Sequence, residues 1–312
     1  ALRTRLENSP LTPRSAEEQL DLCRSVIEQW HEGPAGLISV MVAPSAPLRC
    51  SDAFLSGLAA IADEYGVGVH THLLETPVAV DICMERYGKS LVTRMGDLGL
   101  LGPHVSCAHG IYVSDDDIRL LAETRTTIVH NPVSNLRIGD GIAPVIALAR
   151  GGVPLAIGTD GPSTNDNLNL FEEVKLAAIL HRCGGAPMED WISDGEALRM
   201  ATAGGAKAIG LEGALGTVTA GARADLVLLD LDTVQFTPLN DLVRQIVYSD
   251  CGHSADTVIV DGRVLMEGRK TLTIDEGTLL QKARDMRDAS RSRNADLYDF
   301  TDELMPYLEP TN

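Results

Sequence analysis

Histidines and one aspartate stand at the ends of several apolar segments, and these residue types suit metal chemistry. His70 and His72 close one such segment, His109 and His130 close the next two, and Asp160 closes the last. Neutral imidazoles together with a carboxylate are ligands that Zn²⁺ or Fe²⁺ prefers in proteins. One such histidine alone would more often be a core residue. Because the pattern recurs in successive segments, it favours a metal site.

Glu75 follows His72 by three residues, just beyond the end of the same segment. A carboxylate there can reach a metal-activated water without binding the metal, which is the position of a proton shuttle. The alternative is a surface glutamate that caps the next helix. Asp160 lies between Gly158 and Gly161, and these glycines predict a backbone that turns sharply and approaches a ligand closely. The other histidines are expected to be structural or at the surface: His31, His104, His181 and His253.

Strand-like and helix-like segments alternate through the first 190 residues and would position these side chains. The spacing is about 25–35 residues per unit, which predicts a parallel sheet with helices outside it, either a barrel or a doubly wound sheet. In a β/α barrel the C-terminal ends of the strands carry the catalytic groups. Ser15 with Glu18, and Ser114 with Asp117, predict helix starts. The expected strands are residues 37–43 (buried on both faces), 67–74, 105–109, 126–130 and 153–160.

The pattern changes beyond about residue 211. Residues 224–230 and 257–265 are predicted to be short strands, and the second range contains an Asp-Gly hairpin turn. We therefore divide the chain into three parts. They are a catalytic partial barrel over residues 1–211, a small β-sandwich unit over 212–275, and a C-terminal helix and tail over 276–312.

Composition excludes several classes of protein. The 312 residues are 44% hydrophobic and 22% charged, and the formal net charge is −18. Such a surface repels phosphate backbones, and 4% aromatic residues are too few to stack bases, so we expect no nucleic-acid partner. No apolar run is long enough to predict a membrane span. The six cysteines show no close spacing, which predicts reduced thiols and a cytoplasmic location.

Four motifs in order resemble the amidohydrolase superfamily, in particular the branch of the triazine hydrolases and the methylthioadenosine/S-adenosylhomocysteine deaminases. The resemblance runs from about residue 38 to 268 and is specific for the superfamily but not for a substrate. It implies an α/β fold, a TIM-like (β/α)8 metal-dependent hydrolase barrel with a small β-sandwich unit. The motifs are His70-Thr71-His72-Leu73-Leu74-Glu75-Thr76, Ala108-His109, His130-Asn131-Pro132-Val133-Ser134-Asn135 and Gly158-Thr159-Asp160-Gly161, with Ala224-Asp225-Leu226 and Asp261-Gly262-Arg263 in the β unit.

The resemblance also implies roles for individual residues. His72, His109 and Asp160 would bind one divalent metal, zinc ahead of iron, and Glu75, His109 and Asp160 would be catalytic. Glu75 would be the acid/base, His109 would polarise the metal-bound water, and Asp160 would accept a proton from that water. The expected substrate-binding residues are Ser45, His130, Asn131, Ser134 and Asn135.

The implied reaction is attack of a metal-activated hydroxide on an sp² carbon, with loss of ammonia, an amine or chloride. We therefore predict a metal-dependent hydrolase of a non-peptide C–N bond in a nitrogen heterocycle or similar small molecule, in the first place a deaminase. A triazine-type hydrolase that releases chloride or an amine is the alternative within this class. The competing class is a catalytically silent barrel that serves as an assembly module.

The chain departs from the family pattern at two places. The family's first strand carries a His-x-His pair that supplies two metal ligands, and this chain has no such strand. His70-Thr71-His72 has the same spacing, but only three strands with polar ends follow it, and Glu75 fits the pattern of the fifth strand. If Asp160 ends strand eight, residues 37–43 are strand four, and this chain contains strands four to eight only. With no initiator Met, we expect an N-terminally truncated chain whose open sheet is covered by further residues, a second chain or a homodimer. Ser45 stands where nucleoside deaminases of the branch carry a substrate-binding histidine, which weakens an adenosine-type assignment.

Overall fold

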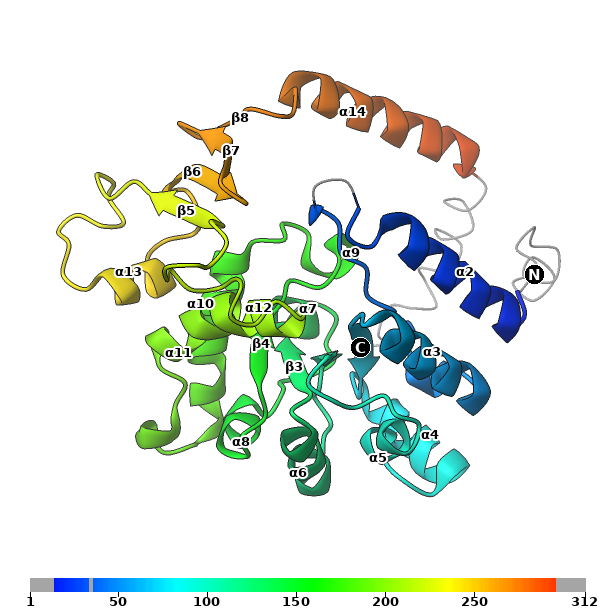
Figure 1. Ribbon diagram of the computed structural model, residues 1–312. Coiled ribbons are helices and arrows are strands. Elements are labelled where there is room, and N and C mark those ends of the chain that lie inside the picture. Colours follow the sequence, from blue (N-terminus) through cyan, green and yellow to red (C-terminus); the bar gives the residue numbers. More distant parts are fainter. Residues whose placement is uncertain (1–13, 34–35, 296–312) are drawn as a thin grey trace. The chain divides into compact units, whose positions relative to one another are not determined.

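The computed structural model of this protein describes residues 14–33 and 36–295. The chain divides into two compact units, coloured along the sequence in Figure 1. The first contains the described residues up to Arg223 together with Leu231–Ser254, and the second contains Ala224–Asp230 and the described residues from Ala255 onward. The predicted tail after the C-terminal helix, residues 296–312, lies outside the described residues.

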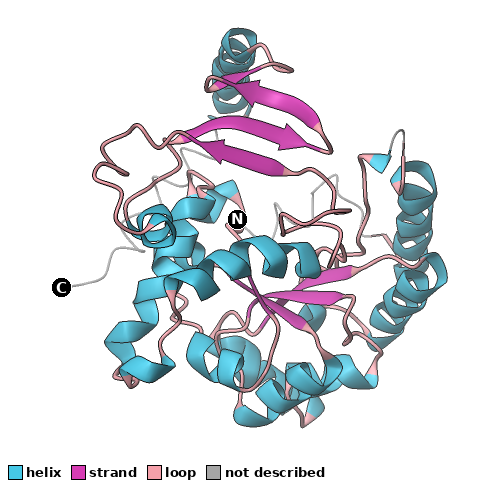
Figure 2. Ribbon diagram, turned by 60° about the vertical axis from the view of Figure 1, so that its left-hand side comes forward, coloured by secondary structure: helices cyan, strands magenta, loops and turns pink. Residues whose placement is uncertain are grey.

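Four parallel strands form the centre of the first unit and lie side by side in chain order (Figure 2). They are β1 (Val69–Leu73), β2 (Val105–His109), β3 (Thr127–His130) and β4 (Leu155–Ile157). Leu73 pairs with His109, and His130 pairs with Ile157, so the C-terminal ends of neighbouring strands are level. This parallel α/β sheet confirms the predicted fold class, and it brings the predicted site residues to one edge.

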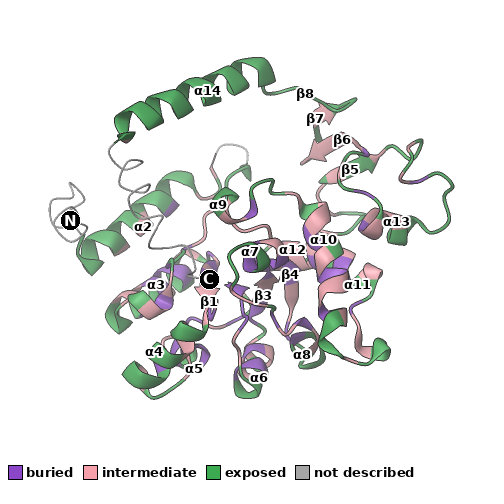
Figure 3. Cartoon of the chain, turned by 180° about the vertical axis from the view of Figure 1, so that it is seen from behind, coloured by how far each residue is buried: buried purple, intermediate pink, exposed green. Residues whose placement is uncertain are grey.

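Helices connect the strands and bury their apolar faces against the sheet, as the colouring by burial shows (Figure 3). The predicted capping boxes are present at Ser15 with Glu18 and at Ser114 with Asp117. The α-helices of this unit are α2 (Ala16–Trp30), α3 (Asp52–Tyr65), α4 (Pro77–Tyr87), α5 (Leu91–Asp97), α6 (Asp115–Thr124), α7 (Pro132–Arg137), α8 (Val145–Arg150), α9 (Pro162–Asn165), α10 (Leu170–Ile179), α11 (Asp194–Arg199), α12 (Gly205–Ala208) and α13 (Leu242–Tyr248). The short 3₁₀ helices are η2 (Pro47–Arg49), η3 (Leu180–Gly184) and η4 (Met188–Asp190), and η5 (Met200–Gly204) is a turn of π-helix.

The predicted strand at residues 37–43 is wrong. Only Val42 pairs with the sheet, through a single parallel bridge to Val69. Leu37 and Ile38 are 49% and 39% exposed, rather than buried on both faces. A buried parallel strand needs a neighbour on each side. Among the described residues this segment has a neighbour on the β1 side alone, so the apolar run does not extend into a strand.

The second unit is a four-stranded antiparallel sheet followed by an exposed helix. The strands, in spatial order, are β5 (Leu226–Leu229), β6 (Ala255–Val260), β7 (Arg263–Glu267) and β8 (Lys270–Thr271), and the helix is α14 (Glu276–Arg293). Asp261 and Gly262 join β6 to β7 with φ values of 49° and 75°, the left-handed pair that the predicted Asp-Gly hairpin turn requires. No helix in the described ranges is long and apolar enough to cross a membrane.

A buried arginine of α5 fastens the segment that precedes α3. The Arg94 guanidinium donates to the carbonyl oxygens of Pro47 and Cys50, each at 2.9 Å, and pairs with the Asp52 carboxylate. The Thr71 hydroxyl donates to the carbonyl oxygen of Pro44, at the start of the same segment. Arg94 and β1 thereby fix the backbone on both sides of Ser45, one of the predicted site residues.

We expect Arg94→Met to lower the free energy of unfolding by about 2 kcal/mol, because it leaves two carbonyl oxygens without their buried donor, whereas the exposed Asp52 carboxylate is solvated by water. Urea denaturation measures the change. Arg119→Met is the matched control, because its pair with Asp116 is exposed and should contribute less than about 0.5 kcal/mol. Equal losses in the two variants would contradict the fastening role of Arg94.

Candidate metal centre and active site

Three of the predicted site residues converge at the C-terminal edge of the parallel sheet. His72 in β1, His109 at the end of β2 and Asp160 after β4 each offer a ligand atom, and these atoms lie within 4.8 Å of one another. The rings of His72 and His109 are stacked, with centroids 5.4 Å apart and planes 21° apart. The structure therefore brings together a His-His-Asp group that is able to bind a metal.

His109 is fully buried, and one of its ring nitrogens forms no hydrogen bond, although the Glu75 carboxylate lies 3.5 Å from it. Its Nδ1 lies 2.8 Å from Oδ1 of Asn135, whereas Nε2 forms no hydrogen bond in the described structure. Buried polar atoms are nearly always paired, so an orphaned ring nitrogen calls for an explanation. With Oδ1 of Asn135 as the acceptor, the proton lies on Nδ1, and Nε2 keeps the lone pair that a metal needs.

The ring of His72 is oriented by the main chain. Its Nδ1 donates to the carbonyl oxygen of Ser45, which leaves Nε2 free to bind a metal. Ser45 was predicted as a substrate-binding residue. Its backbone supports a predicted metal ligand in the structure.

The Asp160 carboxylate is held by two hydroxyl groups. Its Oδ2 accepts hydrogen bonds from Ser134 Oγ at 2.6 Å and from Thr164 Oγ1 at 3.0 Å. Burial acts to raise the pKa of Asp160, but these two hydrogen bonds and the nearby His109 outweigh it, so that the pKa lies below its ordinary value. Asp160 is therefore ionised at neutral pH, and with two imidazoles it offers a donor set that would fit a divalent metal.

Two of these residues sit on strained backbone. His109 has a φ of 74° and Asp160 a φ of 59°, in the left-handed region that side chains other than glycine seldom adopt. Of the glycines beside Asp160, Gly158 is required, because a Cβ there would lie 2.6 Å from Oδ1 of Asn131. Gly161 has an ordinary φ of −90° and open surroundings, so the expected sharp turn is made by Asp160 itself.

Glu75 lies beside the group and has an acidic neighbour that the sequence analysis missed. Oε1 of Glu75 is 3.5 Å from Nε2 of His109, and the Glu75 side chain is 30% exposed. The Asp140 carboxyl adjoins Glu75, and its pKa is raised, first by burial and then by the charge and hydrogen bonding of Glu75. Asp140 lies between Gly139 and Gly141, and Asp160 also lies between glycines. This shared pattern could have identified Asp140 as a candidate site residue from the sequence.

The predicted substrate-binding residues His130, Asn131, Ser134 and Asn135 are all buried. Ser134 contacts Asp160, and Asn135 contacts His109. His130 is buried with Nδ1 unpartnered, and burial, followed by the charges of His181 and His109, lowers its pKa to about 3.

His70 lies outside the three-residue group. Its Nδ1 is 2.8 Å from Ser106 Oγ, and burial lowers its pKa. His181 is structural, as expected, since its Nε2 accepts from the backbone N–H of Ile192.

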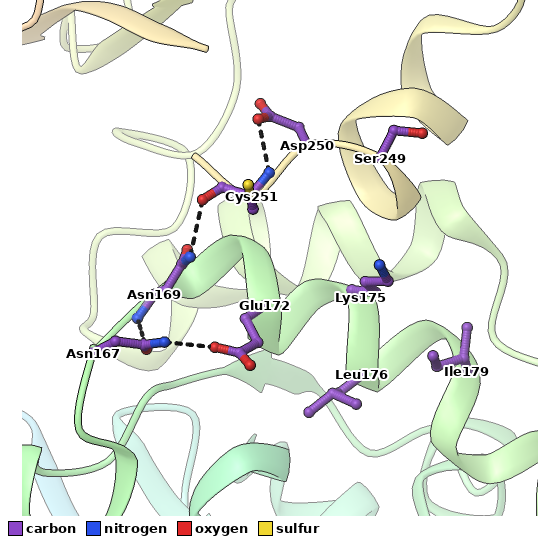
Figure 4. Close-up of a pocket in the computed structure, with 9 residues that line it drawn as sticks. All are labelled: Asn167, Asn169, Glu172, Lys175, Leu176, Ile179, Ser249, Asp250 and Cys251. Carbon is purple, nitrogen blue, oxygen red and sulfur yellow. Dashed lines mark hydrogen bonds between the residues drawn. The ribbon is translucent and has the colours of Figure 1, made fainter. Parts of the chain in front are cut away.

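A separate cavity of about 600 Å³ lies on the other side of α10 (Figure 4). Asn169 donates to the carbonyl oxygen of Cys251 at its rim, and Glu172 accepts from Asn167. None of the metal-site residues lines this cavity. The lining residues are Asn167, Asn169, Glu172, Lys175, Leu176, Ile179, Ser249, Asp250 and Cys251.

Comparisons with known proteins agree with the sequence resemblance. The sequence pattern of the Amidohydrolase family matches residues 3–265. The chain is 40% identical over 261 residues to a 5-methylthioadenosine/S-adenosylhomocysteine deaminase of Caldanaerobacter subterraneus subsp. tengcongensis, covering 83% of this chain and 60% of the relative. It is 39% identical over 269 residues to a 5'-deoxyadenosine deaminase of Methanosarcina acetivorans, covering 86% and 61%. The chain thus spans about three fifths of the length of these relatives.

Solved structures share the fold. An adenosine deaminase from Xanthomonas campestris with bound zinc superposes with a TM-score of 0.84 at 33% identity, covering 88% of this chain and 62% of that one. An atrazine chlorohydrolase from Arthrobacter aurescens TC1, complexed with zinc, gives a TM-score of 0.83 at 27% identity, covering 89% and 61%. These neighbours confirm the predicted fold class and the predicted branch of the superfamily.

Ser134→Ala should weaken metal binding by about 10–100-fold, because the Asp160 carboxylate loses one of the two hydroxyls that orient it. Titration of the metal-free protein with Zn²⁺ against a chelating dye measures the affinity. Ser163→Ala, which alters an exposed serine of α9, is the control and should bind as the wild type does. If both variants bound zinc equally, Ser134 would have no supporting role at Asp160.

The buried His130 predicts a dependence of stability on pH. Its folded pKa of about 3 is below the ordinary value of 6.5, so its stabilising contribution is present above pH 6.5 and is lost as the pH falls towards 3. One such group adds a slope of at most about 1.4 kcal/mol per pH unit. His130→Asn, which cannot titrate, should reduce the slope of the unfolding free energy between pH 6 and pH 4. An unchanged slope would contradict the assignment.

Proposed function

Because this chain belongs to the amidohydrolase family, we propose that it acts as a metal-dependent hydrolase that removes ammonia from a nitrogen heterocycle. The observation that carries the proposal is the buried Nε2 of His109, which forms no hydrogen bond and lies beside His72 and Asp160. An imidazole nitrogen without a hydrogen bond, next to a second imidazole and an ionised carboxylate, is suited to holding a metal rather than to stabilising a fold.

The substrate we propose is an adenosine derivative. Similar proteins carry the names 5-methylthioadenosine/S-adenosylhomocysteine deaminase and 5'-deoxyadenosine deaminase, and their substrates share the adenine ring while differing at the 5′ position. Ser45 departs from the histidine expected in nucleoside deaminases. Its backbone oxygen accepts a hydrogen bond from His72, a contact that a residue of any type could make at this position. A triazine-type hydrolysis is the second candidate, because an atrazine chlorohydrolase shares the fold.

The proposed metal is zinc, held by His72, His109 and Asp160, with iron as the alternative. Zinc is bound in the similar solved structures of an adenosine deaminase and an atrazine chlorohydrolase. When bound, such a metal would supply a water of lowered pKa, and the resulting hydroxide is the nucleophile for the reacting carbon.

The remaining steps belong to side chains of this chain. Glu75 is partly exposed and lies 3.5 Å from His109 Nε2, so its carboxyl can pass its proton to a ring nitrogen of the heterocycle. The ionised Asp160 accepts one proton of the attacking water, and Glu75 takes up the second and passes it to the departing amine. Asp160 then returns its proton to Glu75, so that both carboxyl groups regain their starting states when ammonia leaves. His130 stays neutral with a free Nδ1, and together with Asn131 it is proposed to bind the heterocycle.

We propose a cytoplasmic location and a homodimer. The location is supported by the six cysteines, all of which are free thiols. The dimer is supported by the edge of the parallel sheet at β1, where only Val42 pairs, because an open sheet edge favours a covering partner. Light scattering of the purified protein tests the dimer, and a monomer at micromolar concentration would contradict it.

Ammonia release from a panel of heterocycles tests the proposed activity. The protein in its full natural form, saturated with zinc, is assayed for ammonia release with 5'-deoxyadenosine, 5-methylthioadenosine and S-adenosylhomocysteine, and for chloride release with atrazine. Ammonia from the adenosine derivatives is the expected result, whereas turnover of atrazine alone would favour the second candidate. If no compound reacted and less than stoichiometric metal were bound, the silent assembly module would be the better account.

We expect Glu75→Gln to reduce kcat by about 10²–10⁴-fold, because glutamine keeps the shape of the side chain but cannot carry a proton. Metal content, measured by atomic emission, should be unchanged. Glu85→Gln is the control, since Glu85 lies exposed on α4. Wild-type turnover of the Glu75 variant with bound metal would remove Glu75 from the mechanism.

A further inference from the structure

Glu173 of α10 is a buried carboxylate that has no part in the chemistry above. Its exposed fraction is 0%. Within the described part of the chain its charge is not offset by a basic side chain, and its oxygens accept hydrogen bonds from two N–H donors. A buried carboxylate without a cation is costly, which is why such groups are rare outside functional sites. Glu173 therefore requires a specific explanation.

The two donors to Glu173 come from two different elements of the site. One is the backbone N–H of Val133 in the first turn of α7, 3.0 Å from Oε2, and the other is Nδ2 of Asn165, which ends α9. Each donor is directly adjacent in the chain to a hydroxyl that holds Asp160. Ser134 follows Val133, and Thr164 precedes Asn165.

A second connection runs through α7 to His109. Asn135, two residues after Val133, accepts from Nδ1 of His109. One carboxylate on α10 is thus tied to both elements that orient Asp160, and one of these elements also orients His109.

We propose that Glu173 is a positioning residue that fixes α7 and α9 relative to each other and thereby sets the positions of the Ser134 and Thr164 hydroxyls at Asp160. Its kinetic consequence rests on the function proposed above. Its effect on metal binding does not, because the metal site is measured without a substrate.

The geometry requires a carboxylate at this position rather than an amide. Both groups that face Glu173 are donors, so both of its oxygens must accept. A glutamine would turn its NH₂ group towards Val133 or Asn165. Asn165 cannot rotate its amide to compensate, because its Oδ1 already accepts from the backbone N–H of Leu168 at 2.8 Å. Glu173→Gln would therefore leave two buried donors facing each other.

Burial and hydrogen bonding act in opposite directions on the pKa of Glu173. Burial raises its pKa to about 7, assisted by the negative charges of Glu172 and Asp160, although the hydrogen bonds from Val133 and Asn165 act to lower it. A proton on Glu173 would convert one of its acceptors into a donor, with the same consequence as the glutamine substitution.

A rescue experiment tests the proposal. Glu173→Gln should weaken zinc binding by about tenfold or more and lower kcat at unchanged KM. In the double variant Asn165→Asp/Glu173→Gln the carboxylate moves to the other side of the same contact. The glutamine oxygen can then accept from Val133, its NH₂ group can donate to the aspartate, and the aspartate can still accept from Leu168. This double variant should recover the zinc affinity and kcat of the wild type.

Glu172→Gln is the matched control, because Glu172 is the adjacent residue but faces the cavity on the other side of α10, where it bonds to Asn167 (Figure 4). It should behave as the wild type. If Glu173→Gln bound zinc as Glu172→Gln does, the proposal would be overturned.

If Glu173→Gln does not fold, the zinc affinity of the double variant tests the positioning role of Glu173. Wild-type zinc affinity in Asn165→Asp/Glu173→Gln would support the positioning role. A folded double variant with weak binding, or one that also fails to fold, would overturn it. The zinc titrations need no substrate. They therefore test the positioning role of Glu173 even if the proposed deaminase activity is not found.

Discussion

The Nε2 atom of His109 is a buried acceptor without a hydrogen-bond partner, and the rest of the site is built around it. Leaving a polar atom unpaired in a protein interior costs free energy that the fold must offset elsewhere. Here the strands bring a second imidazole and an ionised carboxylate to the same place, in His72 and Asp160. A metal would satisfy all three groups at once, which explains why the fold retains the unpaired atom.

The ligand groups owe their orientation to a layer of contacts behind them. The carbonyl oxygen of Ser45 fixes the ring of His72, the Asn135 amide fixes that of His109, and two hydroxyls fix Asp160. Such supports select the tautomer and aim the ligand atoms before any metal arrives. The left-handed backbone at His109 and Asp160 shows that the fold accepts local strain to place these two side chains.

Much of this arrangement could be predicted from the sequence, because parallel strands are apolar runs and their C-terminal ends share one edge. That logic located His72, His109 and Asp160. It failed at residues 37–43, where an apolar run alone does not supply the neighbour that a strand needs. It could not show that Ser134 and Asn135 contact Asp160 and His109. The direction of their side chains depends on how α7 begins, and Glu173, a residue distant in the sequence, accepts a hydrogen bond from the backbone at that start. The available signal was an acidic residue among Leu170, Val174 and Ala177 on the apolar face of a helix.

The central claim is that hydrolysis requires one metal ion at the His-His-Asp group. The decisive measurement is stepwise addition of Zn²⁺ to the metal-free protein in its full natural form, with ammonia release from 5'-deoxyadenosine recorded at each step. The account predicts that the rate rises in proportion to the added metal, reaches a plateau at one equivalent, and is absent when His72 and Asp160 are replaced by alanine. Ammonia release at full rate from metal-free protein, or from that double variant, would contradict it.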